Sequence, residues 1–215
     1  MSKRKAEQGF SLLEMIVVVM IIMVFGAMAI MSTRSTTFSS KANEAMDQVI
    51  TQLRSARQLA LTMRRNVLVT ITAPNVITLA VQTLPGEAAA TPIAPVYLND
   101  NVAGGCTFYV YPGLPDTPMG FGNSTALTFA PASGGTAGLA VLFSTSGSLV
   151  GTTASSGYNT LGNSNPVNAS IFLAIPGQLN TARAVTVLGS TGRVRNYSWT
   201  GPATGGTTAN WQEEQ

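Results

Sequence analysis

An uncharged apolar run at residues 15–33 limits what this chain of 215 residues can fold into. Every residue from Ile16 to Phe25 is a large aliphatic side chain, a methionine or a phenylalanine. At about 1.5 Å per residue, a helix of this length spans a bilayer core about 30 Å thick. Basic residues at positions 3–5 precede the run, and the positive-inside rule places them in the cytoplasm. The sequence therefore predicts one membrane-spanning helix over residues 10–33.

Residues 1–9 form a leader that differs from an ordinary secretory signal, because no small-residue cleavage site ends the apolar run before Ile30. The small residue, Gly9, stands before the run instead. The stretch Gly9-Phe10-Ser11-Leu12-Leu13-Glu14 resembles the class III signal of type IV prepilins and type II secretion pseudopilins. In that family an inner-membrane prepilin peptidase cuts after the glycine and methylates the new N-terminus. The resemblance implies that Gly9 precedes the cut and that Phe10 becomes the methylated first residue.

The carboxylate of Glu14 stands at the start of the apolar run. A lone carboxylate in a membrane segment is costly and rare unless it has a partner. The resemblance implies that Glu14 serves filament assembly by meeting the N-terminal amine of Phe10 on a neighbouring subunit. The alternative is an interfacial glutamate that reaches water above a plain signal anchor.

The formal net charge of +3 does not indicate a polyanionic partner, because residues 1–9 contribute three basic side chains and one acidic side chain. Without them, nine basic and eight acidic residues leave a net charge of +1. The chain has no histidine and one cysteine, Cys106, which excludes histidine-dependent nucleophile systems, the usual zinc sites and an intrachain disulfide. We therefore expect no enzymatic activity, no cofactor and no metal. A calcium site through Asp100 and Asp116 would lack further acidic ligands.

Residues 34–65 continue the helix with a different pattern. Apolar residues recur there at steps of three and four, which is typical of an amphipathic helix that supports a domain. Gly26 and the Ser- and Thr-rich residues 32–37 could kink the helix, or could be a harmless exit from the membrane. The arginines at 54, 57, 64 and 65 could form a basic face, or the solvated side of the helix.

Residues 66–200 change to short β-branched runs separated by turns, which predicts antiparallel sheet. The first two runs, at residues 67–72 and 76–81, are expected to form a hairpin. Residues 84–95, 112–122 and 151–168 have the composition of loops, and residues 201–215 that of a flexible tail. The expected fold class is α+β and pilin-like, with a long N-terminal helix packed on a β-rich domain.

The C-terminal half of the sequence resembles one particular group within this family. The turn at residues 143–148, the strand at 171–173, the strand beginning at Arg183 and the turn Gly192-Arg193-Val194-Arg195 are similar to the GspH/FimT group of minor pseudopilins. Some FimT-like minor pilins use a Gly-Arg-x-Arg turn to bind DNA during uptake. Arg193 and Arg195 would project from one face of a strand, where both could contact phosphate oxygens. In secretion pseudopilins of this group the same turn simply ends a hairpin.

Taken together, these residues predict a structural minor pilin or pseudopilin of a type II secretion system or a type IV pilus. The resemblance implies a single-pass protein of the bacterial inner membrane, with its C-terminal domain in the periplasm or at the cell surface after assembly. The implied partners are prepilin peptidase, other pilin subunits, the inner-membrane assembly platform, and a secreted substrate or DNA. The alternatives are a DNA-binding minor pilin and the major subunit of a type IV-like pilus.

Overall fold

The computed structural model describes residues 11–82, 90–98, 105–130, 140–151, 166–202 and 206–214. The side chains of residues 27–35 are outside that description. The chain divides into two compact units, residues 1–37 and residues 38–215. The predicted leader, residues 1–9, and the predicted methylation site at Phe10 lie outside the described residues.

One long helix, α1, runs from Leu12 to Met63 and contributes to both units. Its 52 residues agree with the single helix that the apolar run and the apolar periodicity predict. The helix continues through Gly26 and residues 32–37, so the helical hydrogen bonding is not interrupted at either of the two weak points. Over the part of the chain that the structure describes, no helix has the length and hydropathy of a membrane span.

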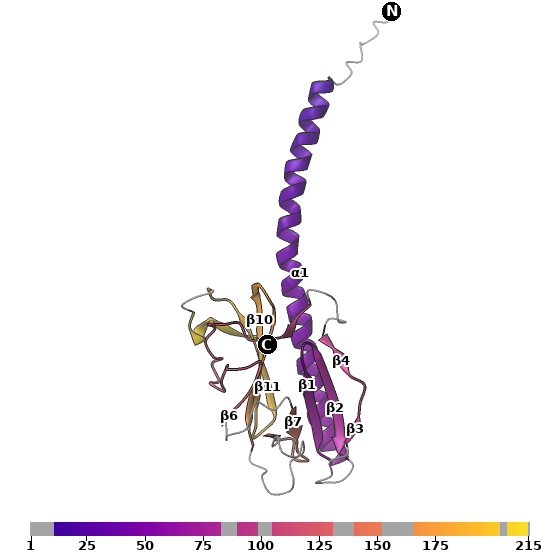
Figure 1. Cartoon of the computed structure of the whole chain (residues 1–215), viewed down its shortest axis with the longest axis vertical. Coiled ribbons are helices and arrows are strands. Elements are labelled where there is room, and N and C mark those ends of the chain that lie inside the picture. The colour runs from indigo at the N-terminus through magenta and orange to yellow at the C-terminus, as the bar shows by residue number, and fades with distance from the viewer. Residues whose placement is uncertain are drawn as a thin grey trace, which may run out of the picture. The chain divides into compact units, whose positions relative to one another are not determined.

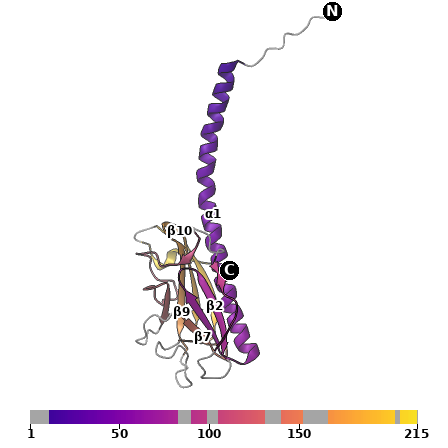
Figure 2. The same cartoon turned by 45° about the vertical axis from the view of Figure 1, so that its right-hand side comes forward.

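The second unit contains two antiparallel sheets, visible beside the C-terminal part of α1 in Figures 1 and 2. The first sheet has the order β3-β2-β1-β7-β8, with β4 also paired to β2. The predicted hairpin is confirmed as β1 and β2, in which Val67 pairs with Val81 and Thr72 with Val76. The strands of this sheet are β1 (Val67–Thr72), β2 (Val76–Gln82), β3 (Ala90–Pro92), β4 (Val96–Tyr97), β7 (Ala140–Phe143) and β8 (Leu149–Gly151).

The second sheet has the order β12-β11-β10-β9-β5, with β6 also paired to β9. Its longest strand, β10, lies between β9 and β11 and holds the sheet together. The strands of this sheet are β5 (Thr107–Phe108), β6 (Leu127–Ala130), β9 (Asn168–Ile175), β10 (Gln178–Leu188), β11 (Arg193–Trp199) and β12 (Trp211–Glu214).

The main core forms where the C-terminal part of α1 meets both sheets. Met46 and Leu53 of α1 pack there with inward-facing residues such as Val69 of β1 and Val185 of β10. Alternate residues of a strand point to opposite faces, so β10 also buries Ala184 in a second cluster on the other face of its sheet. That second cluster contains Trp199, and segment 109–119 packs on it. Burying a large aliphatic side chain contributes about 1.5–3 kcal/mol, so this interface holds α1 to the domain.

Two parts of the chain differ from the sequence-based expectation. The end of the expected flexible tail, residues 201–215, forms a short 3-10 helix, η2 (Thr208–Asn210), and then β12, which pairs with β11. Local composition misses this strand because its stability comes from Trp211, which packs on Trp199 with ring centroids 5.2 Å apart. The expected loop at residues 84–95 contains β3 at its end, where Pro92 pairs with Ala80.

Candidate functional site

Of the N-terminal candidate residues, the structure describes Glu14. Glu14 lies in the first turn of the helix and is exposed, and its backbone N–H donates to the carbonyl of Ser11 at 3.0 Å. A carboxylate is favourable there, because the helix dipole places partial positive charge at the N-terminus. Gly9 and Phe10 lie outside the described residues, so their geometry relative to Glu14 is not part of the structure.

The helix beyond Glu14 exposes an unusually apolar surface. Each large apolar side chain from Leu12 to Phe25 is at least 45% exposed, and Leu12 reaches 77%. Soluble monomers rarely expose apolar patches this extensive, and such patches mark contacts with lipid or with another protein. This stretch of α1 therefore needs a partner environment that the isolated chain does not supply.

The second candidate region is the turn between β10 and β11. Gly192 adopts a left-handed φ of 65°, and its N–H donates to the carbonyl of Leu188 at 2.7 Å. A Cβ atom at Gly192 would overlap the carbonyl oxygen of Gly147, in the turn between β7 and β8. Arg57 of α1 lies beside both turns. Its Nε donates to that Gly147 oxygen at 3.4 Å, and a Cβ atom at Gly192 would lie 2.8 Å from the same Nε. Glycine at position 192 thus allows two turns and the helix to pack closely.

Arg193 and Arg195 lie on the same face of β11 but in different surroundings. Arg193 is exposed. Arg195 forms an ion pair with Glu213 of β12, with Nη1 and Oε2 3.4 Å apart. A hydrogen bond with Tyr197 and the nearby Glu213 carboxylate raise the pKa of Arg195, so it stays cationic. The structure therefore leaves Arg193 as the more available of the two predicted DNA contacts.

Arg183 of β10 is a buried charge whose role the sequence did not indicate. It is only 4% exposed, and its guanidinium donates to neutral acceptors. Nε donates to Oδ1 of Asn43 at 2.8 Å, and Nη2 donates to Oγ of Ser39 at 3.2 Å. Nη1 donates to the backbone carbonyls of Asn180 and Ala182, both at 3.0 Å. The two helix partners are four residues apart, so they share one face of α1.

The electrostatics around Arg183 involve Cys106 and Glu214. Burial lowers the pKa of Arg183, while the Glu214 carboxylate acts in the opposite direction. Burial also raises the pKa of Cys106 to about 12, against the influence of Arg183. Cys106 is therefore a protonated core thiol.

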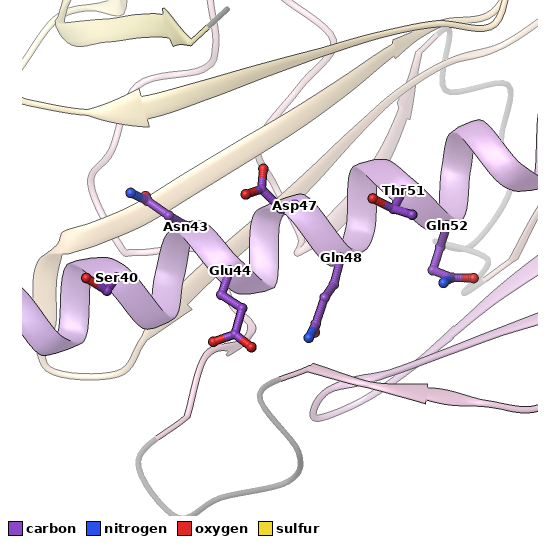
Figure 3. A pocket seen from close by; sticks show the side chains of 7 residues that line it. All are labelled: Ser40, Asn43, Glu44, Asp47, Gln48, Thr51 and Gln52. Atoms are coloured by element: carbon purple, nitrogen blue, oxygen red, sulfur yellow. The ribbon is translucent and has the colours of Figure 1, made fainter.

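A shallow groove of about 520 Å³ lies along α1 in the second unit. Figure 3 shows Asn43 and Asp47 on one side of the helix and Glu44 and Gln48 on the other. The groove therefore presents a carboxylate on each side. Its lining residues all come from α1: Ser40, Asn43, Glu44, Asp47, Gln48, Thr51 and Gln52.

The calcium alternative has no support in the described residues. Both carboxylate oxygens of Asp116 accept backbone N–H groups, from Thr117 at 2.7 Å and from Gly122 at 2.6 Å. Asp100 lies outside the described residues. Within the described part of the chain, no three His, Cys, Asp or Glu side chains gather closely enough to hold a metal ion. Asp116 instead closes the loop that packs on the second cluster.

Comparisons with known proteins identify the N-terminal segment. Residues 4–30 match the prokaryotic N-terminal methylation motif, which confirms the signal that these residues predict. The chain is similar to crystal structures of the type IV minor pilin FimU from Pseudomonas aeruginosa strain PAO1 in two space groups. In space group P65 the identity is 14% and the TM-score 0.42, over 75% of this chain and 93% of FimU. In space group P21 the identity is 16% and the TM-score 0.39, over 80% of this chain and 92% of FimU. A search of curated proteins finds no significant match.

Proposed function

We propose, on the premise that this chain is a pilin-like structural protein and not an enzyme, that it is a processed subunit of a type II secretion pseudopilus or a type IV pilus. The observation that carries the proposal is the methylation motif at residues 4–30, within which the long helix α1 begins at Leu12. Within that motif, Gly9 is the residue before the cut and Phe10 is the methylated residue. The assigned role is that of a minor subunit, and the alternative is the major subunit of a type IV-like pilus.

The exposed apolar surface of α1 supports this role. Before assembly, the bilayer would cover the side chains from Leu12 to Phe25, with residues 10–33 as the spanning segment of an inner-membrane protein. After assembly, the same surface would pack against the helices of other pilin subunits. Neither environment exposes these side chains to water, so one surface serves both stages.

Glu14 supports the assembly step. In an apolar filament core, its carboxylate would be costly unless a cation joined it. Cleavage after Gly9 would create that cation, the amine of Phe10 on a neighbouring subunit. Processing by prepilin peptidase would thus produce the group that compensates Glu14. An uncut leader would supply no amine at that position.

The experiment is mass spectrometry of the N-terminal peptide from the full chain. The chain is produced in one bacterial strain that contains prepilin peptidase and in an otherwise identical strain that lacks it. The expected peptide begins at methylated Phe10 in the first strain and is absent from the second. A Gly9→Val chain in the first strain is the matched control and should stay uncut. An uncut chain in both strains would reject the proposal and leave a membrane-anchored domain.

The abundance of that peptide separates the minor subunit from the major subunit. Sheared surface filaments and membranes are compared from the same cells. A processed chain that is scarce in filaments and retained mainly in membranes supports a minor subunit. A processed chain that dominates the filaments identifies a major subunit and rejects the minor assignment.

A second candidate function is DNA binding through the Gly192–Arg195 turn. The observation that favours it is the position of Arg57, which contacts the turn at Gly147 and lies beside Gly192, so that a third arginine adjoins the turn. The opposing observation is the Arg195–Glu213 ion pair. Because phosphate contacts make binding salt-dependent, retention of DNA by the full chain in detergent should fall with salt.

The test of DNA binding compares four variants. Arg193→Ala should weaken DNA retention more than Arg195→Ala, because Glu213 already engages Arg195. Glu213→Gln should strengthen it by releasing Arg195. Equal retention by the original chain and the Arg193→Ala/Arg195→Ala double variant would reject this function.

A further inference from the structure

The end of α1 leaves five consecutive side chains exposed, from Leu61 to Arg65. Two of them are large and apolar, since Leu61 is 43% exposed and Met63 is 51% exposed. The last two, Arg64 and Arg65, are cationic at neutral pH. Within the described residues, neither arginine forms an ion pair or a hydrogen bond. We call Leu61, Met63, Arg64 and Arg65 the helix-end surface.

The backbone at Arg64 is unusual for a residue with a side chain. The helix ends at Met63, and Arg64 follows it with a left-handed φ of 50°. Glycine is the usual residue directly after a helix in this conformation, because it adopts positive φ without a steric penalty. Among the described residues, Arg64 is the one non-glycine residue with positive φ. The backbone therefore gains nothing from an arginine here, whereas the surface gains a cation.

The turn between β7 and β8 extends the helix-end surface with hydroxyl groups. A Cβ atom at Gly147 would lie 3.2 Å from Cδ2 of Leu61, so this turn lies against the end of the helix. Ser146 of the turn is exposed, and its Oγ lies 2.8 Å from Oγ of Ser144 and 3.1 Å from Oγ of Ser148. Hydroxyl groups can donate to phosphate oxygens. The turn therefore adds neutral donors near the end of the helix.

The helix-end surface combines positive charge with apolar side chains, and this combination favours one kind of partner. Nucleic acid attracts arginine through its phosphates, but its phosphate backbone gives Leu61 and Met63 no apolar environment. An anionic bilayer supplies both. Its surface charge raises affinity about fivefold for each nearby arginine, and the boundary between its headgroups and acyl chains receives apolar side chains.

We propose that the helix-end surface docks on an anionic lipid bilayer. The two arginines contact lipid phosphates, the two apolar side chains enter the boundary between headgroups and acyl chains, and Ser146 donates to a headgroup oxygen. The contact of one copy is weak and reversible, because it has only two cations and two partly exposed apolar side chains. This inference goes beyond the proposed function, because neither cleavage nor filament assembly takes part in it.

The first experiment measures binding of the full chain to lipid vesicles. The chain is held in neutral nanodiscs of phosphatidylcholine, and the discs that sediment with added vesicles are counted as bound. Empty nanodiscs are the control. We expect binding to vesicles that contain phosphatidylglycerol, little binding to vesicles of phosphatidylcholine alone, and weaker binding at high salt, because exposed charges are screened. Equal binding to both kinds of vesicle would overturn the proposal.

Single variants identify the surface that binds. Arg64→Ala and Arg65→Ala should each lower the affinity for anionic vesicles about fivefold. The matched control is Arg54→Ala, which removes an exposed arginine of the same helix about 15 Å before Arg64 and should lower the affinity much less. Met63→Ser should weaken binding severalfold without a change of charge. A loss with Arg54→Ala as large as that with Arg65→Ala would indicate attraction by net charge alone and overturn the proposal.

The variant Arg64→Gly separates docking from a purely structural role. Glycine suits the left-handed backbone, so thermal unfolding should show a domain no less stable than the original. The variant should nevertheless bind anionic vesicles about fivefold more weakly. Cations near the C-terminal end of a helix also complement its dipole, and that role alone predicts unchanged binding. Unchanged binding by both Arg64→Gly and Arg65→Ala would therefore overturn the docking surface.

These outcomes are distinct from those of the proposed function. The nanodiscs hold the full chain whether or not it has been cut after Gly9, so a failure of processing leaves the vesicle result intact. A processed chain that does not bind anionic vesicles overturns the docking surface alone. Retention of double-stranded DNA through Arg64 and Arg65, without binding to anionic vesicles, would assign the surface to nucleic acid and overturn the lipid proposal.

Discussion

Nε of Arg183 donates a 2.8 Å hydrogen bond to Oδ1 of Asn43, so that a buried guanidinium on β10 is tied to a side chain on α1. Within the described residues this guanidinium forms no ion pair. A buried charge is tolerated only when its hydrogen bonds are satisfied. The bonds to Asn43 and Ser39 therefore hold the start of the second unit's helix against the second sheet.

We predict that Asn43→Ala destabilises the domain by about 1–3 kcal/mol, the usual cost of leaving a buried hydrogen-bonding group without its partner. Denaturant unfolding of the full chain in detergent measures the change. Gln58→Ala is the matched control, because Gln58 lies on an exposed face of the same helix. In an Arg183→Met background, Asn43→Ala should cost much less, since no guanidinium then needs its acceptor. Equal costs in both backgrounds would contradict this role for Asn43.

The helix could be predicted from sequence, because its determinants are local. The three- and four-residue spacing of apolar side chains identifies the buried face of α1, and Met46, Val49 and Leu53 are buried as that spacing requires. Met63 fits the same spacing but is 51% exposed, because the helix ends there. Periodicity thus identifies a face, and the extent of the sheets decides how much of it is covered.

The roles of Arg183 and Trp211 could not be predicted in the same way. Alternation along β10 puts Arg183 on the same face as Val185 and Val187, but only the packing of α1 shows which acceptors it meets. Trp211 follows a Gly- and Thr-rich stretch, and its Nε1 donates to the carbonyl of Pro115, 96 positions earlier. Contacts at such separation depend on topology, which local composition does not encode.

Gly192 provides a second prediction, which separates backbone strain from close packing. Gly192→Ala should destabilise the domain more than Gly177→Ala. Both glycines have positive φ, 65° and 84°, but a Cβ at Gly177 meets nothing within 4 Å. The Cβ at Gly192 would overlap the Gly147 oxygen and approach Arg57 Nε at 2.8 Å. Thermal unfolding of the two variants measures the difference, and equal loss would show that φ alone matters.

Asp116 provides a third prediction, about metal dependence. Asp116→Ala should loosen the loop at residues 116–122, because two backbone N–H groups lose their acceptor. Hydrogen exchange of the Gly122 amide should accelerate, while the Leu173 amide in the central strand β9 should stay protected. Chelators should change neither rate in the original chain. Slower exchange of Gly122 on adding calcium would contradict the structural role of Asp116.

Cys106 provides the last prediction, which concerns pH. Its pKa is raised from 9.0 to about 12 in the folded state, so folding favours the protonated thiol. The resulting stability is fully present below pH 9 and is lost as the pH rises toward 12. Alkylation by iodoacetamide at pH 8 should therefore be slow in the folded chain and rapid in denaturant, because the thiolate is the reactive form.

The matched control for that pH effect is Cys106→Ala, which lacks the titrating group. Its unfolding free energy should decline less than that of the original chain between pH 8 and pH 10. The cavity left by the missing sulfur lowers stability at every pH, so the comparison uses the slope with pH and not the absolute value. Parallel pH profiles for the two chains, or alkylation of the folded chain as fast as in denaturant, would show that the Cys106 thiol is not protected by burial.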